Sequence, residues 1–301
     1  MKEKPDPFEQ DRCDRISVDR SDDGVDAELK VRRYRRDGFE VSALVKEGRD
    51  PSVVLLHGAA GNALAWLPIL PVLDGRRAIL VDLPGHGESP PVEEWSLEAL
   101  ARNIGEAIGC EHPGSLVWGG HSWGGKVAAV LAGLRPDCVC GLLLIDPAPA
   151  KAVPIIPEEY VASSLAPEIG PWWSYAEAVA AAQKLQQYES WRIELRRAFD
   201  RGIERHEDGT VAGRVRREWL VSITAASLNH DDSALIRSIK CPTLLMVAEK
   251  SLWWQEPTNL AVLRDLTNVT TAVLAGRHYL HWDSPNRVIE TARQWLQGLT
   301  T

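Results

Sequence analysis

The sequence has few cysteines, no excess of basic charge and no long apolar stretch. Its cysteines are odd in number and match no metal-ligand or disulfide spacing: Cys13, Cys110, Cys138, Cys140 and Cys241. Reduced, buried thiols in a reducing compartment are therefore expected. The net charge of −8 and the lack of basic runs interleaved with aromatic residues argue against nucleic acid as a partner. No uncharged run approaches the ~18 residues of a membrane span, and the first ten residues are too charged for a secretory signal. These absences predict a cytoplasmic protein with no membrane partner.

The bulk composition is typical of a soluble globular protein. The chain has 301 residues, of which 45% are hydrophobic and 25% are charged. This length allows one large α/β domain, or such a domain with an inserted subdomain. Residues 1–28 are rich in Asp, Arg and Glu and poor in large apolar groups, so we expect a mobile or loosely docked N-terminal arm.

Apolar runs along the chain alternate with helical patterns. Residues 29–34 and 39–45 alternate apolar and polar side chains around Arg36-Asp37-Gly38, which predicts a hairpin with one wetted face. Continuous apolar runs, typical of strands buried on both faces, follow at 53–56, 78–81, 116–118, 142–145, 244–247 and 271–274. Helical patterns lie at 96–108, 126–134, 260–266 and 287–299. The order predicts an α/β fold: a mostly parallel, eight-stranded sheet flanked by helices, with the hairpin at one edge.

Nearly a hundred residues separate the strands that end at Ile145 and begin at Leu244. Helical patterns at 175–188, 191–199 and 214–228 fill much of this gap, so it is not a disordered loop. Its length and position predict an inserted helical cap at 147–238, above a core formed by 29–146 and 239–301.

A strand, a tight turn and a helix meet in the stretch Leu116 to Gly125. Ser122 lies at the centre of G-x-S-x-G, between an apolar run and a helical pattern. A turn this tight needs small neighbours, which Gly120 and Gly124 provide, and it presents the serine hydroxyl beside the first amides of the helix. Those amides and the helix dipole favour negative charge. The pattern predicts a nucleophile, although an ordinary turn has the same composition.

Four further stretches follow strands and contribute to the same rim of the sheet. They are His57-Gly58 in a glycine-rich turn, D-x-P-G-H-G-x-S at 82–89, Asp146, and Gly276-Arg277-His278. Taken together with G-H-S-x-G-G, these motifs and their order resemble the α/β-hydrolase superfamily. The resemblance covers residues 29–299 apart from the cap.

The resemblance implies roles for individual residues. Ser122 matches the nucleophile, and His278 matches the base that takes the serine proton and returns it to the leaving group. The backbone N–H groups of Ala59 and Trp123 match the oxyanion hole. No cofactor is implied.

The triad acid departs from the family pattern. Ser251 stands where relatives place the carboxylate after the seventh strand, and a serine cannot offset an imidazolium charge. Some members carry the acid after the sixth strand, where this chain has Asp146. We therefore favour Asp146 as the triad acid, with Glu249 and Glu256 as alternatives. A purely structural role is also open to Asp146, because a carboxylate at this position can cap the end of the strand.

The chain has 12 Trp but only 3 Phe. Several tryptophans fall beside the expected oxyanion hole, in the cap or in the loop after the seventh strand: Trp66, Trp172, Trp173, Trp253 and Trp254. They predict a flat-walled apolar pocket, although packing of the cap onto the core would also use them. His206 and His230 lie among acidic residues, but no second cluster supports a metal site, and none is expected.

These features favour a serine hydrolase that cleaves a carboxylic ester or lactone of a largely apolar or aromatic small molecule. Thioester hydrolysis and C–C bond hydrolysis would use the same residues. Two alternatives remain open because of Ser251: a cofactor-free dioxygenase of a heteroaromatic substrate, and a biosynthetic or binding member without hydrolytic activity. The oligomeric state is not predicted.

Overall fold

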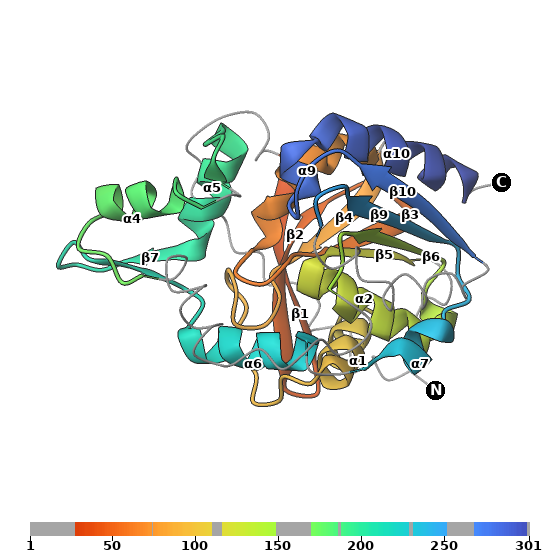
Figure 1. Cartoon of the computed structure of the whole chain (residues 1–301). Helices are drawn as coiled ribbons and strands as arrows, with labels where there is room; N and C mark the ends of the chain where they lie inside the picture. The colour runs from red at the N-terminus through yellow and green to blue at the C-terminus, as the bar shows by residue number, and fades with distance from the viewer. Residues whose placement is uncertain are drawn as a thin grey trace, which may run out of the picture.

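The computed structural model describes residues 28–73, 75–109, 116–148, 170–185, 188–228, 231–251 and 268–299. A sheet of eight strands runs through the centre of the molecule in the order β1-β2-β4-β3-β5-β6-β9-β10 (Figure 1). The strands are β1 (Leu29–Arg36), β2 (Phe39–Lys46), β3 (Arg49–Leu56), β4 (Arg76–Val81), β5 (Leu116–His121), β6 (Gly141–Ile145), β9 (Thr243–Ala248) and β10 (Val269–Leu274). The hairpin β1–β2 is antiparallel at one edge and β2 pairs antiparallel with β4, while the remaining neighbours are parallel.

Helices cover both faces of the sheet. On one face lie α1 (Leu97–Ile108) and α2 (Ser122–Leu134), and on the other lie α10 (Pro285–Gly298) and the 3₁₀ segment η2 (Ala63–Leu73) (Figure 1). The central strands are buried on both sides, and every residue of β5, β6 and β9 is buried. This is why their sequences are continuous apolar runs rather than alternating ones.

Helix α1 shows how local sequence sets an element's bounds. The Ser96 side chain accepts a hydrogen bond from the Ala99 N–H and caps the N-terminus of the helix. Gly109 ends the helix with φ of 91°, a left-handed conformation that favours glycine.

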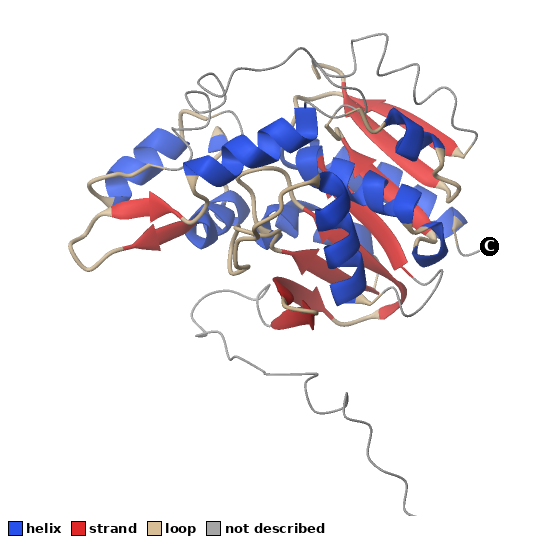
Figure 2. Ribbon diagram, turned by 90° about the horizontal axis from the view of Figure 1, so that it is seen from below, coloured by secondary structure: helices blue, strands red, loops and turns tan. Residues whose placement is uncertain are grey.

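The segment between β6 and β9 contains helices and a small hairpin. Its elements are α4 (Tyr175–Ala182), α5 (Ile193–Gly202), β7 (Ile203–Arg205), β8 (Val211–Gly213), α6 (Arg217–Leu228) and α7 (Ser233–Arg237). Helix α4 and the hairpin project from one side of the sheet, away from the C-terminus (Figures 1 and 2). The hairpin was not predicted, and α4 ends at Ala182 instead of continuing to Tyr188. The cap boundaries stay a prediction.

The predicted fold class and all eight predicted strands are confirmed. Strand β5 is longer than expected and runs to His121, so α2 begins directly at Ser122. The expected N-terminal arm, apart from Glu28, and the expected helix at 260–266 lie outside the described residues. Within the described part of the chain, no helix is both long and apolar enough to cross a bilayer.

Candidate active site

The predicted nucleophile lies where β5 passes into α2. Ser122 has φ of 51°, an uncommon left-handed conformation for a residue with a side chain. A Cβ on Gly124 would lie 2.3 Å from the carbonyl oxygens of Leu56 and His57, and one on Gly120 would lie 2.4 Å from the Gly124 carbonyl carbon. Only glycine fits at these two positions, so the turn packs tightly on the end of β3 and holds Ser122 at the rim of the sheet.

Asp146 and His278 are in direct contact. The distance from His278 Nδ1 to Asp146 Oδ2 is 2.7 Å, and the other carboxylate oxygen accepts the Ala248 N–H at 3.0 Å. The Asp146 side chain is fully buried, whereas the His278 side chain is 27% exposed. The imidazole therefore donates its Nδ1 proton to a desolvated carboxylate and is open to solvent elsewhere. A catalytic base held by an acid has this geometry.

His121 joins the nucleophile turn to the loop that carries the base. Its Nε2–H donates to the His278 carbonyl oxygen at 2.8 Å, and the ring centroids of the two histidines are 4.6 Å apart. Because His121 immediately precedes Ser122, this contact brings the predicted nucleophile and base to the same place. This contact between His121 and the loop of the base was not predicted from the sequence.

The other candidates for the acid do not meet His278 in the described part of the chain. Glu249 is exposed, and its N–H pairs with the Leu274 carbonyl. Ser251 is buried, and its hydroxyl has no hydrogen-bond partner among the described residues. Glu256 lies outside the described residues.

Two buried histidines hold the loop that contains Ala59. His57 donates from Nδ1 to the Gly58 carbonyl at 2.7 Å and accepts the Leu83 N–H at Nε2 at 2.9 Å. His86 donates to the Pro84 carbonyl at 2.8 Å and accepts the Ala60 N–H at 3.2 Å. Both side chains thus hydrogen-bond to the backbone of the turns that contain them. Burial lowers the pKa of His57 to about 4 and that of His86 to about 3, so both rings are neutral.

The expected oxyanion donors occupy suitable elements. Ala59 lies in the turn after β3 that the Gly61 N–H closes by bonding to the Gly58 carbonyl at 3.0 Å. Trp123 follows Ser122 in the first turn of α2, where N–H groups have no partner within the helix. The Trp123 side chain is buried and stacks near His86, with centroids 5.4 Å apart.

The loop that carries the base is clamped by residues that sequence analysis missed. Arg277 pairs with Asp283, whose two oxygens accept from its backbone N–H, Nε and Nη2 at 2.9 to 3.0 Å. A fourth hydrogen bond, from Arg277 Nη1 to Glu189 at 2.8 Å, reaches the segment between β6 and β9. The pair brackets His278 in sequence and fixes its backbone.

The tryptophans have different environments. Trp66 is wholly buried against His281, at 5.1 Å between centroids, and Trp172 is buried among residues of α4, α5 and β8. Trp173 is 83% exposed. Trp253 and Trp254 lie outside the described residues. The three described side chains serve packing or face solvent, and the apolar pocket stays a prediction.

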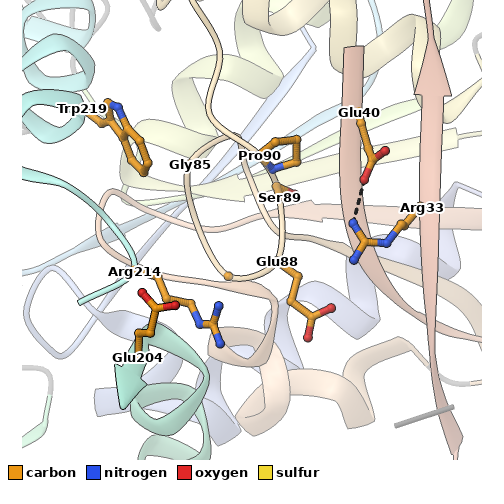
Figure 3. Close-up of a pocket in the computed structure, with 10 residues that line it drawn as sticks. Arg33, Glu40, Gly85, Glu88, Ser89, Pro90, Glu204, Arg214 and Trp219 are labelled. Carbon is orange, nitrogen blue, oxygen red and sulfur yellow. Dashed lines mark hydrogen bonds and ion pairs between the residues drawn. The ribbon is translucent and has the colours of Figure 1, made fainter. Parts of the chain in front are cut away.

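A groove of about 450 Å³ opens between the β1–β2 hairpin, the loop after β4 and the segment between β6 and β9 (Figure 3). Charged side chains line it, among them Arg33 paired with Glu40, and Glu88, Glu204 and Arg214. None of the proposed catalytic residues lines it. Its polarity differs from that of the expected apolar pocket.

The fold and the site together define a class of protein. Residues 53–291 match the model of the alpha/beta hydrolase family, and the chain belongs to that family.

Individual relatives include esterases. The chain is 40% identical over 99 residues to a pimeloyl-[acyl-carrier protein] methyl ester esterase of Methylococcus capsulatus, covering 33% of this chain and 37% of that protein. It is 25% identical over 263 residues to the sn-1-specific diacylglycerol lipase ABHD11 of Mus musculus, covering 82% and 81%. The chain spans less than half the length of the first curated relatives it matches, at 37 to 48%. Among solved structures, the peroxisomal alpha-beta-hydrolase Lpx1 of Saccharomyces cerevisiae has the same fold, with a TM-score of 0.75 at 20% identity, covering 91% of this chain and 89% of that one.

Proposed function

We propose that this chain is a carboxylic ester hydrolase in which Ser122 is the nucleophile, His278 the base and Asp146 the triad acid. The observation that carries the proposal is the 2.7 Å contact between His278 Nδ1 and the buried Asp146 carboxylate, on the loop that His121 ties to the Ser122 turn. The two relatives described above carry names of ester-cleaving enzymes, which supports an ester over the other acyl substrates.

The reaction would follow from these positions. His278 takes the Ser122 proton at Nε2 while the serine oxygen attacks the acyl carbon, and Asp146 stabilises the imidazolium. The Ala59 and Trp123 N–H groups donate to the oxyanion of the tetrahedral intermediate. The imidazolium returns its proton to the leaving alcohol, and water activated by His278 then releases the acid and regenerates Ser122.

The substrate would be a carboxylic ester or lactone of a largely apolar or aromatic molecule. Thioesters and C–C bonds next to a carbonyl remain within reach of the same residues. A panel of p-nitrophenyl esters of increasing chain length, with aryl esters, lactones and thioesters, would rank these classes. A preference for short, polar esters would contradict the apolar assignment.

The first test is labelling by a fluorophosphonate probe, with the adduct located by mass spectrometry. We expect the adduct on Ser122, and its loss in the Ser122→Ala and His278→Ala variants. A folded wild-type protein that gives no adduct and cleaves no ester would refute the acyl-enzyme mechanism.

A cofactor-free dioxygenase is the second candidate, because such relatives also carry the acid after the sixth strand, where Asp146 meets His278. There His278 would deprotonate a heteroaromatic hydroxyl, and Ser122 would form no acyl intermediate. Oxygen consumption with a hydroxyquinolone, retained in Ser122→Ala, would favour this function over ester hydrolysis.

A further inference from the structure

The loop after β4 contains a buried carboxylate with a structural task. Asp82 is fully buried, and its two oxygens accept the N–H groups of Ala63 at 2.8 Å and Glu88 at 3.1 Å. A Cβ on Gly87 would lie 2.2 Å from the Asp82 carboxyl carbon, so the loop wraps closely around this group. An ionised carboxylate in such a place is costly unless a cation neutralises it.

The cation comes from helix α5. Arg201 Nη2 lies 2.5 Å from Asp82 Oδ2, and Arg201 Nε lies 3.4 Å from the other oxygen, which makes a two-pronged contact. The remaining guanidinium nitrogen lies 3.3 Å from Glu88. Among the described residues, no other cation lies within ion-pair distance of Asp82.

A second contact places the end of α5 on the stretch that follows the oxyanion loop. The Asn62 side chain is buried and donates to the Ala198 carbonyl at 2.7 Å, while its oxygen accepts the Leu64 N–H at 3.0 Å. A Cβ on Gly202 would be 3.4 Å from the Asn62 amide nitrogen. The last turn of α5 therefore packs directly on residues 62 and 63.

These contacts hold the stretch of chain that directly follows the proposed oxyanion donor. Ala59 is followed by Ala60, whose N–H is held by His86 of the loop after β4. Beyond Gly61, Asn62 is held by α5 and Ala63 by Asp82. The position of the Ala59 N–H thus depends on the loop that Asp82 organises, and Asp82 depends on Arg201 for its neutralising charge.

We propose that Arg201 is a positioning residue for the oxyanion hole, which acts through Asp82 to fix the Ala59 N–H from helix α5. This inference rests on the proposed ester hydrolase function. It has a structural consequence: α5 stays docked during turnover, because its departure would leave a buried carboxylate without its cation.

The test compares Arg201→Met with Arg196→Met in the full chain. Arg196 lies on the same helix, with a side chain that is 55% exposed and a peripheral contact to Asp200 at 3.9 Å, so it is a matched control. The readouts are kcat and KM for a p-nitrophenyl ester, and the inhibition constant of an aryl trifluoromethyl ketone. That ketone forms a tetrahedral adduct on serine whose oxygen anion occupies the oxyanion hole.

We expect Arg201→Met to lose about 10- to 100-fold in kcat, less than the 10²- to 10³-fold typical of deleting a donor, because the N–H is displaced and not removed. The inhibition constant should rise by a similar factor, KM should change less than about 3-fold, and Arg196→Met should stay within about 2-fold of wild type. Arg201→Lys should recover part of the loss, since it keeps the charge without the fork.

Two results would overturn the inference. One is an Arg201→Met protein that is folded but less heat-stable, with kcat and the inhibition constant unchanged. The other is a rise in KM alone. If Arg201→Met does not fold, the Asp82→Asn/Arg201→Met variant removes both charges and is measured in its place. Fluorophosphonate labelling, read together with ester cleavage, separates this inference from the proposed function. A folded wild type that neither labels nor cleaves an ester refutes the function, whereas equal labelling rates in the wild type and Arg201→Met refute only the role of Arg201.

Discussion

Replacing Asp146 by Asn tests the triad most directly. The substitution keeps the size of the side chain but changes what it offers to its two partners, His278 Nδ1 and the Ala248 N–H. If the amide oxygen stays on the Ala248 N–H, the amide NH₂ faces Nδ1. The ring must then place its proton on Nε2 and cannot accept the Ser122 proton. We expect kcat to fall by ~10⁴-fold, which corresponds to about 5 kcal/mol of transition-state stabilisation.

The opposite orientation of the Asn side chain gives a different signature. The amide oxygen would then face His278 and preserve the tautomer, but its NH₂ would meet the Ala248 N–H. A buried donor left without an acceptor costs about 1–3 kcal/mol of folding stability. Measuring kcat for a p-nitrophenyl ester together with the unfolding midpoint distinguishes the two cases.

Glu249→Gln is the matched control, because Glu249 is an exposed acid just after the neighbouring strand. We expect its kcat to stay within about 2-fold of wild type, as is usual for surface substitutions. The assignment of Asp146 would be wrong if Asp146→Asn kept both wild-type kcat and stability, or if Glu249→Gln lost activity instead.

Three further outcomes concern stability. Burial lowers the pKa of His57 to about 4 and that of His86 to about 3, so as pH falls below about 6.5 protons bind these residues in the unfolded chain before they bind them in the folded chain. Between pH 6.5 and 5 these two histidines should together lower the free energy of unfolding by about 3 kcal/mol, and His121 and His281, whose pKa values burial also lowers, should add to this loss. Equal urea midpoints at pH 7.5 and 5 would contradict this expectation. Gly124→Ala should lower stability by about 3 kcal/mol in a thermal melt, because its Cβ would meet two backbone carbonyls at 2.3 Å; an unchanged melt would show that the turn can relax. Lys126 Nζ lies 2.9 Å from the buried Asp232 carboxylate, so Lys126→Met should lower the free energy of unfolding by about 3–5 kcal/mol because it leaves that carboxylate unpaired. The double variant Lys126→Met/Asp232→Asn should recover part of this loss in the same thermal melt. If it recovers nothing, the loss comes from packing and not from the unpaired charge.

The sheet could be predicted from the sequence because the burial of each strand determines a local pattern of apolar residues. The run Val53-Val54-Leu55-Leu56 is apolar throughout because β3 has neighbours on both edges and helices on both faces. The hairpin β7–β8 could not be predicted in this way. Its strands have three residues each, which is too few for an alternating pattern to be recognised, and they lie in the gap between the helical patterns at 191–199 and 214–228.

The same difference between local patterns and long-range contacts applies to the candidate site. The Ser122 turn is a local motif, and its glycines are required by contacts within a few residues or with the adjoining strand. The pairing of Arg201 with Asp82 spans 119 positions, and nothing in either local pattern indicates it. Tertiary packing determines the contacts between the core and the segment inserted into it. The periodicity of a single sequence indicates helices and strands but does not indicate such long-range contacts.

The choice of acid illustrates how geometry narrows an ambiguity left by the sequence. A carboxylate that merely caps a strand end needs one oxygen to accept a backbone N–H, and Asp146 Oδ1 meets that need at Ala248. The capping interpretation leaves Oδ2 unexplained. That oxygen is buried, and its hydrogen-bond partner among the described residues is His278. Asp146, which directly follows β6, also has a left-handed φ of 39°, and Ser122, which directly follows the neighbouring strand β5, has φ of 51°. A left-handed φ at a residue other than glycine costs on the order of 1–3 kcal/mol of folding stability. Glycine would avoid this cost but would supply no carboxylate. A carboxylate kept at that cost, with one oxygen reserved for the imidazole, is what a triad acid requires and a strand cap does not.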